Sequence, residues 1–161
     1  MIHNSKKVIA DLVLMTTSHI KYAKQLLEIS EEKLQIKHSE KSWSVLECLE
    51  HLNRYALFYN AEINKKMNAS SLPFSETFKS SYLGQKFSMD MLPKENMKTM
   101  NTFKSKNPNS SALSKETVLL SFIQLQEELL SYLENAKNKN LDKIKTKTTL
   151  PILKFKLGDT F

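Results

Sequence analysis

Three long segments of this chain, residues 6–29, 44–67 and 114–138, repeat apolar side chains at steps of three and four residues. None of them contains a glycine or a proline, and the whole 161-residue chain holds only two glycines and four prolines. Such spacing is typical of amphipathic helices. The shortage of glycine disfavours all-β sandwiches and barrels, which need many tight turns. The sequence therefore predicts an all-α helix bundle that forms a single domain over residues 1–161.

The second of these helices has a well-marked start. Ser44 and Glu47 have the spacing of a capping box, in which the serine hydroxyl and the glutamate carboxylate each accept from the other residue's backbone N–H. Trp43 precedes the cap, where a hydrophobic staple places an apolar residue, and its partner would be Cys48. The predicted apolar face of this helix consists of Val45, Leu49, Leu52, Ala56, Tyr59 and Ile63.

The connections between the helices differ in length. Residues 30–42 form a connector with one predicted turn at residues 31–34, whereas residues 68–113 form a long crossover between the second and third helices. The crossover has too many aromatic and methionine side chains for a disordered linker, and these either form core or line a ligand pocket. Near the end, Asp159 or Thr160 is predicted to cap a further helix. We expect the fourth wall of the bundle to come from beyond the printed sequence or from a partner.

The charge pattern narrows the classes of partner. The formal net charge is +7, yet 23 of the 24 basic residues are lysines and Arg54 is the only arginine. A nucleic-acid interface usually uses arginine for bidentate contacts, so we interpret the lysines as a solvated surface and expect no nucleic-acid partner. No apolar run has the length of a membrane span, and we expect no membrane partner. A single cysteine and the lack of an export signal favour the cytoplasm.

Few residues offer chemistry. The four histidines are too scattered for a short zinc motif. His51 lies beside the predicted apolar stripe of the second helix, where it is either a metal ligand that projects into the bundle or a boundary histidine that is hydrogen-bonded to a neighbour. Cys48 is either a thiolate made acidic by the helix dipole or, as we prefer, a small core residue. Glu47 is either a general base or, again preferred, the capping residue described above.

The run Trp43-Ser44-Val45-Leu46-Glu47-Cys48-Leu49-Glu50-His51-Leu52-Asn53 resembles the signature of the DinB-like superfamily. The crossover, with Met97-Lys98-Thr99 and Phe103, and the run from Leu157 to Thr160 are similar to the same architecture in outline. The resemblance implies a DinB-like four-helix bundle in which the histidine matching His51 is the first ligand of a divalent metal, zinc or nickel. It also implies two further histidine ligands, one turn apart on the last helix. Because the sequence ends at Phe161, we expect the chain to be truncated and the fourth helix to be largely missing from it.

The resemblance also implies a function. Members of the superfamily include thiol-dependent transferases, an isomerase and metal-dependent hydrolases. The prediction is therefore a metal-dependent transferase or hydrolase of small molecules, which acts with or without a low-molecular-weight thiol. The alternative is a non-catalytic helical protein without a metal, which binds a ligand or forms a homodimer through its open face.

Overall fold

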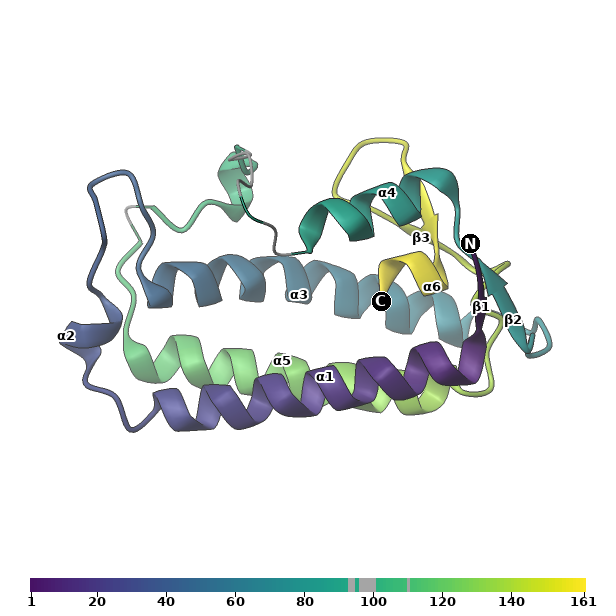
Figure 1. The fold of residues 1–161 in the computed structure, drawn as a ribbon, viewed down its shortest axis with the longest axis horizontal. Coiled ribbons are helices and arrows are strands. Elements are labelled where there is room, and N and C mark those ends of the chain that lie inside the picture. The colour runs from purple at the N-terminus through teal and green to yellow at the C-terminus, as the bar shows by residue number, and fades with distance from the viewer. Residues whose placement is uncertain (93–94, 96–100, 110) are drawn as a thin grey trace.

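Three long helices dominate the computed structural model, which describes residues 1–92, 95, 101–109 and 111–161. They are α1 (Ser5–Leu26), α3 (Val45–Asn68) and α5 (Lys115–Ala136). α5 packs against both α1 and α3, and α1 runs antiparallel to the other two (Figure 1). The helical architecture predicted from the apolar periodicity is thus confirmed. The residues Met97-Lys98-Thr99, which entered the family resemblance, lie outside the described residues.

The predicted cap at Ser44 is present, and the other two long helices also begin at polar caps. Asn4, Ser44 and Ser114 are the N-caps of α1, α3 and α5, and each side chain accepts a hydrogen bond from a backbone N–H of the first turn. The short turn predicted at residues 31–34 is α2 (Glu31–Leu34). Short polar caps therefore determine where the long helices begin.

Two groups of buried side chains form the core, one toward each end of the bundle. Leu133 and Leu141, with Ile9 from α1 and Ile63 from α3, belong to the first. Leu119 and Leu46 belong to the second and are fully buried. Leu130 packs against both groups and so links them along α5. Burial of these apolar side chains holds the three helices together.

The buried face of α3 is rotated from the predicted one. Val45 and Leu52, both assigned to the apolar face, are 40% and 49% exposed. The prediction was wrong for these two residues because it counted only apolar side chains. Ile63 is buried as predicted, and the other buried residues of α3 are Leu46, Glu47, Asn53, Asn60 and Met67.

Two asparagines account for the rotation. Asn53 and Asn60 are spaced by seven residues, or about two helical turns, and both are buried against α5. The Asn53 Nδ2 donates to the Val118 carbonyl at 3.0 Å, and the Asn60 Nδ2 donates to the Leu125 carbonyl at 2.9 Å. Their partners are spaced by the same interval, so the two bonds match one register of α3 on α5. Polar residues thus occupy positions that a count of apolar residues assigns to solvent.

Two short strand pairs and a short helix cover one end of the bundle. β1 (Ile2–Asn4) pairs antiparallel with β2 (Thr77–Lys79), and β3 (Lys145–Lys147) pairs antiparallel with β4 (Lys154–Lys156). The sequence analysis did not predict these strands, because three residues are too few to show an alternating pattern. α4 (Tyr82–Met91) lies in the crossover, followed by the single turn η1 (Lys104–Lys106). Phe78 of the crossover is buried as predicted, but the prediction of core positions was wrong for the exposed side chains Tyr82, Leu83, Met89, Met91, Leu92 and Phe103.

Both glycines of the chain lie at one junction, where α4 meets the last helical turn, α6 (Leu157–Thr160). A Cβ on Gly84 would overlap the side chain of Asp159, and a Cβ on Gly158 would lie 2.8 Å from the ring of Phe78. Only glycine permits these close approaches without displacement of a neighbour. The junction therefore explains why the chain retains glycine here.

Asp159 does not cap a further helix. α6 begins at Leu157, so Asp159 lies within the turn. Lys156 occupies the N-cap position, and its side chain makes no capping hydrogen bond. The Asp159 carboxylate instead accepts from the hydroxyls of Ser80 and Ser81 and from the Ser81 N–H at 3.1 Å. The N-cap prediction was wrong because these donors, more than seventy residues away in the chain, offer the carboxylate three bonds. Among the described residues, α6 is the last helix, and none of the helices is long and apolar enough to cross a membrane.

Candidate functional site at the start of α3

The capping box forms as predicted and uses both carboxylate oxygens of Glu47. The Ser44 hydroxyl accepts from the Glu47 N–H at 3.2 Å, and the Glu47 Oε2 accepts from the Ser44 N–H at 2.8 Å. The Lys37 Nζ donates to the Glu47 Oε1 at 2.7 Å. Burial alone would raise the pKa of Glu47, but the bonds from Lys37 and Ser44 outweigh it and the pKa is lowered. A carboxylate held in this way is a cap and not a free general base.

Aromatic rings hold the imidazole of His51 on two sides. Trp43 lies with its ring centroid 4.8 Å from that of His51 at an interplanar angle of 50°. Tyr55, one helical turn further along α3, meets the imidazole edge-on at 5.0 Å. The aromatic residue before the cap therefore contacts His51, a contact that the staple prediction did not include.

The crossover provides the hydrogen-bond partner of His51. The His51 Nδ1 lies 2.8 Å from the backbone carbonyl of Lys106. A carbonyl only accepts hydrogen bonds, so Nδ1 carries the proton, and in the neutral imidazole Nε2 then keeps a free lone pair. The ring is half-buried and lies under the crossover, and it is not packed between α3 and α5. The interpretation of His51 as a boundary histidine that is hydrogen-bonded to a neighbour is thus confirmed, whereas its role as a metal ligand stays a prediction.

Arg54 ties the crossover to α3. Its Nε donates to the Glu50 carboxylate at 2.7 Å, its Nη1 donates to the Asn107 carbonyl at 2.5 Å, and its Nη2 donates to the Ser111 hydroxyl at 2.9 Å. The sequence analysis used Arg54 only to argue against nucleic acid. That a lysine-rich chain has a single arginine was the signal that could have identified Arg54 as a site residue. Arginine has a planar fork of hydrogen-bond donors, and lysine does not.

Lys106 of the crossover contacts α3 in turn. Its Nζ donates to the backbone carbonyl of Arg54 and lies 5.5 Å from the ring centroid of Tyr55 and 5.8 Å from that of Phe58. Burial lowers the pKa of the Lys106 amine, and the positive charge of Arg54 lowers it further. This lysine was not predicted as a site residue, since nothing in its local sequence distinguishes it from the other lysines.

Cys48 fits neither interpretation. The preferred core position was wrong, because Cys48 is exposed. Partial desolvation of the thiol raises its pKa, and the negative charge of the neighbouring Glu47 raises it further. The predicted helix-dipole effect is thus outweighed, and Cys48 is not an activated thiolate at neutral pH.

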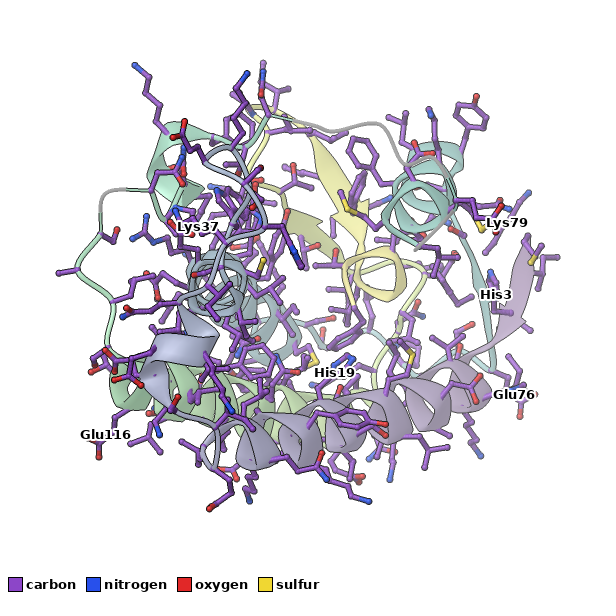
Figure 2. All side chains as sticks on the ribbon, turned by 60° about the vertical axis from the view of Figure 1, so that its left-hand side comes forward. His3, His19, Lys37, Glu76, Lys79 and Glu116 are labelled. Atoms are coloured by element: carbon purple, nitrogen blue, oxygen red, sulfur yellow. The ribbon has the colours of Figure 1, made fainter. Side chains whose placement is uncertain are left out.

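The remaining histidines do not join His51. His3 is in β1 and stacks on Phe78, and His19 is on α1 (Figure 2). His38 is in the connector before α3. Within the described part of the chain, no three His, Cys, Asp or Glu side chains lie close enough together to hold a metal ion. A catalytic zinc site needs about three protein ligands. The described residues therefore offer His51 as one suitable donor, and they do not offer a complete metal site.

A cavity of about 510 Å³ opens beside the start of α3. Its walls come from the connector, from the first turn of α3 and from the last residues of the crossover, and they include Gln35, Lys37, Glu47, Ser111 and Leu113. The crossover thus contributes to the wall, as predicted. The residues that it contributes are Ser111, Ala112 and Leu113, and not the aromatic and methionine side chains that the sequence suggested.

Comparison with known families gives a match along almost the whole chain. The model of the DinB superfamily matches residues 8–161. The chain belongs to the DinB superfamily. In this DinB chain the segment that carried the resemblance, from Trp43 to Asn53, contains the capping box and the ring pair described above. Neither the curated proteins nor the solved structures yielded a match.

Proposed function

We propose that this DinB-superfamily protein is a metal-dependent transferase or hydrolase of small molecules in which the His51 Nε2 is a ligand of a divalent metal, zinc or nickel. The observation that carries the proposal is the bond between the His51 Nδ1 and the Lys106 carbonyl. Histidines that bind metals through one nitrogen typically donate the other N–H to a carbonyl or a carboxylate. Membership of the superfamily supports the proposal at the level of the family.

The metal would supply a nucleophile. A divalent cation with an open coordination position lowers the pKa of a bound water or thiol, which makes a reactive anion available near neutral pH. Since no three possible ligands lie together among the described residues, the proposal requires that further ligands join His51. A longer form of the chain or a second subunit can provide them.

This chain's own residues would bind and orient the small molecule. The cavity beside α3 has a volume in the range typical of small-molecule sites, roughly 300–1,000 Å³, at about 510 Å³. Lys37 and Gln35 at its wall can donate hydrogen bonds to polar groups of a substrate, while Leu113 supplies apolar contact. We propose this cavity as the substrate side of the site, since its wall includes Glu47, one helical turn before His51, although His51 itself does not line it.

A second function has one observation in its favour. Large apolar side chains are exposed on α1 and α3, among them Met15 and Tyr22 on α1 and Val45 and Leu52 on α3. Exposed apolar patches often mark protein–protein contacts. The alternative is therefore a non-catalytic helical protein that has no metal and dimerises through these faces. A monodisperse monomer in light scattering would contradict the dimer.

Metal content tests the main proposal. The complete gene product, purified without chelators, should contain about one zinc or nickel per chain by elemental analysis. His51→Ala should remove this metal, whereas His38→Ala, which changes an exposed histidine of the connector, should retain it. Thermal melts of both variants verify that they fold. Undiminished metal in folded His51→Ala, or a complete product without metal, would contradict the proposal, and the second result would favour the alternative.

A further inference from the structure

We infer that Arg54 is a positioning residue that holds the crossover so that the Lys106 carbonyl keeps His51 in the tautomer with Nδ1 protonated and Nε2 free. The inference rests on the proposed function for the use of Nε2, but the tautomer itself can be measured without any metal. Arg54 touches neither the imidazole nor a substrate in this arrangement. It acts through the backbone of the crossover.

Two successive carbonyls of the crossover point toward α3. Those of Lys106 and Asn107 both face α3, where the first accepts from the His51 Nδ1 and the second accepts from the Arg54 Nη1. Because His51 and Arg54 are three residues apart, their side chains leave neighbouring points of the helix surface. The two carbonyls therefore meet two donors of one helix, and the Arg54 bond fixes the peptide next to the one that His51 uses.

Further hydrogen bonds anchor the crossover on either side of the Lys106 and Asn107 carbonyls. The Arg54 Nη2 also donates to Ser111, four residues beyond Asn107, and the Lys106 Nζ donates back to the Arg54 carbonyl. Between them Pro108 is buried, and it has no N–H that would need a partner. Lys106, Asn107 and Ser111 are thus attached to α3 at four atoms, and the guanidinium of Arg54 supplies two of the donors.

The planar guanidinium of Arg54 allows one side chain to make all of its hydrogen bonds at once. Arg54 uses its Nε for Glu50, which orients the planar guanidinium, and this leaves both terminal nitrogens for the crossover. A lysine has one ammonium nitrogen and cannot donate in this fork geometry. Arg54→Lys would therefore keep the charge and lose the clamp. This difference separates positioning from a general electrostatic effect.

The consequence concerns the metal-binding nitrogen. A neutral histidine without a fixed partner populates both tautomers, and in one of them Nε2 carries the proton and cannot bind a metal. A fixed acceptor at Nδ1 removes that form. Loss of such an outer partner typically weakens metal binding by about 10–100-fold. Arg54, which does not contact the imidazole, would therefore keep the His51 Nε2 free to coordinate a metal.

The test is long-range ¹H–¹⁵N correlation of the histidine rings in the ¹⁵N-labelled chain at a pH of about 8, above the ordinary histidine pKa of about 6.5. In the wild type the His51 ring should show the pattern of a protonated Nδ1 and a bare Nε2. In Arg54→Met and in Arg54→Lys this pattern should give way to a tautomer mixture. Lys65→Met, which removes an exposed charge from the same helix, should leave the wild-type pattern unchanged.

A milder variant keeps the inference testable if the Arg54 variants do not fold. Ser111→Ala removes one acceptor of Arg54 and keeps the guanidinium, so it should shift the tautomer population in the same direction by a smaller amount. A wild-type His51 that carries its proton on Nε2, or a folded Arg54 or Ser111 variant with an unchanged ring pattern, would overturn the inference.

Metal measurements separate this inference from the proposed function. In the complete gene product, Arg54→Met should weaken zinc or nickel binding by about 10–100-fold, with Lys65→Met as the control. If the complete product binds no metal while the tautomer depends on Arg54, the proposed function fails and the positioning role stands. If metal binds through His51 while the tautomer is indifferent to Arg54, the reverse holds.

Discussion

The two sides of α3 are built in different ways. The side toward α5 is a continuous packed surface, with Leu46, Ile63 and Met67 almost fully buried and with two asparagines bonded to α5 carbonyls. The side under the crossover consists of separate contacts, in which His51 and Arg54 reach single carbonyls of the crossover.

This contrast separates stability from chemistry along one helix. Burial of many apolar atoms gives a large and distributed contribution to stability. A few hydrogen bonds between side chains and a connecting segment give a small and local one. The crossover side of α3 can therefore change its contacts without unfolding the bundle, and it is the side that presents the imidazole.

The largest expected effect belongs to the α5-facing side. Leu119 of α5 is fully buried, and Leu119→Ala should lower the free energy of unfolding by about 2–5 kcal/mol because it removes packed atoms and leaves a cavity. Its neighbour Leu120 is 50% exposed, and Leu120→Ala should stay within about 0.5 kcal/mol. Urea denaturation measures both. Equal losses would mean that the packed side is not where the stability resides.

The next effect concerns the register of α3 on α5. Asn53→Ala should cost about 1–3 kcal/mol, since it deletes a buried hydrogen bond and side-chain volume. The Asn53 Oδ1 is buried and has no hydrogen-bond partner among the described residues, so Asn53→Leu should cost less than Asn53→Ala. Thermal unfolding of the two variants provides the comparison. A larger loss for leucine would contradict this expectation and show that the site does not accept the leucine side chain.

A smaller effect and a pH dependence are expected at the capping box. Glu47→Gln should cost about 1 kcal/mol at neutral pH. The pKa of Glu47 is lowered in the folded chain, so its contribution is fully present above the ordinary glutamate value of about 4.3 and disappears as the pH falls through the folded-state pKa. The difference between wild type and variant should therefore shrink in acid.

Urea denaturation as a function of pH measures this difference. Glu40→Gln, which changes an exposed carboxylate of the connector, is the matched control. A difference between wild type and Glu47→Gln that stays constant into acid would contradict the assignment of the lowered pKa to the folded state.

The smallest expected effect lies on the crossover side. Lys106→Met removes the bond to the Arg54 carbonyl and the contacts with the Tyr55 and Phe58 rings, at a cost of roughly 0.5–1 kcal/mol. Limited proteolysis should cut residues 101–109 faster while the melting temperature changes little. Lys104→Met, at an exposed position of the same turn, should not change the cutting rate. Unchanged proteolysis in Lys106→Met would argue that the crossover is held by other means.

Periodicity and capping chemistry were sufficient to predict the long helices, because both are local properties. The Ser44 cap, the Glu47 partner and the short turn at Glu31–Leu34 all follow from residues within a few positions of one another. The orientation of α3 did not follow, since Asn53 and Asn60 become core residues only through acceptors on α5. The role of Asp159 was missed for the same reason, because its donors Ser80 and Ser81 lie in the crossover, more than seventy residues earlier in the sequence.

Only part of the candidate site could be predicted from the sequence. His51 was identified from the run that begins at Trp43, and that run lies within the part of the chain that matches the DinB superfamily. Arg54 and Lys106 were not identified, because their importance comes from a contact between α3 and the crossover, over fifty residues apart in sequence. A metal at His51 remains a prediction.

The ring pair of Trp43 and His51 gives the protein an internal optical probe. Trp43 is the only tryptophan of the chain, and its indole lies 4.8 Å from the imidazole. Its fluorescence emission therefore reports on one place in the molecule, without any label. Titration with Ni²⁺, which quenches a nearby indole, should give a binding curve in the wild type that is absent in His51→Gln.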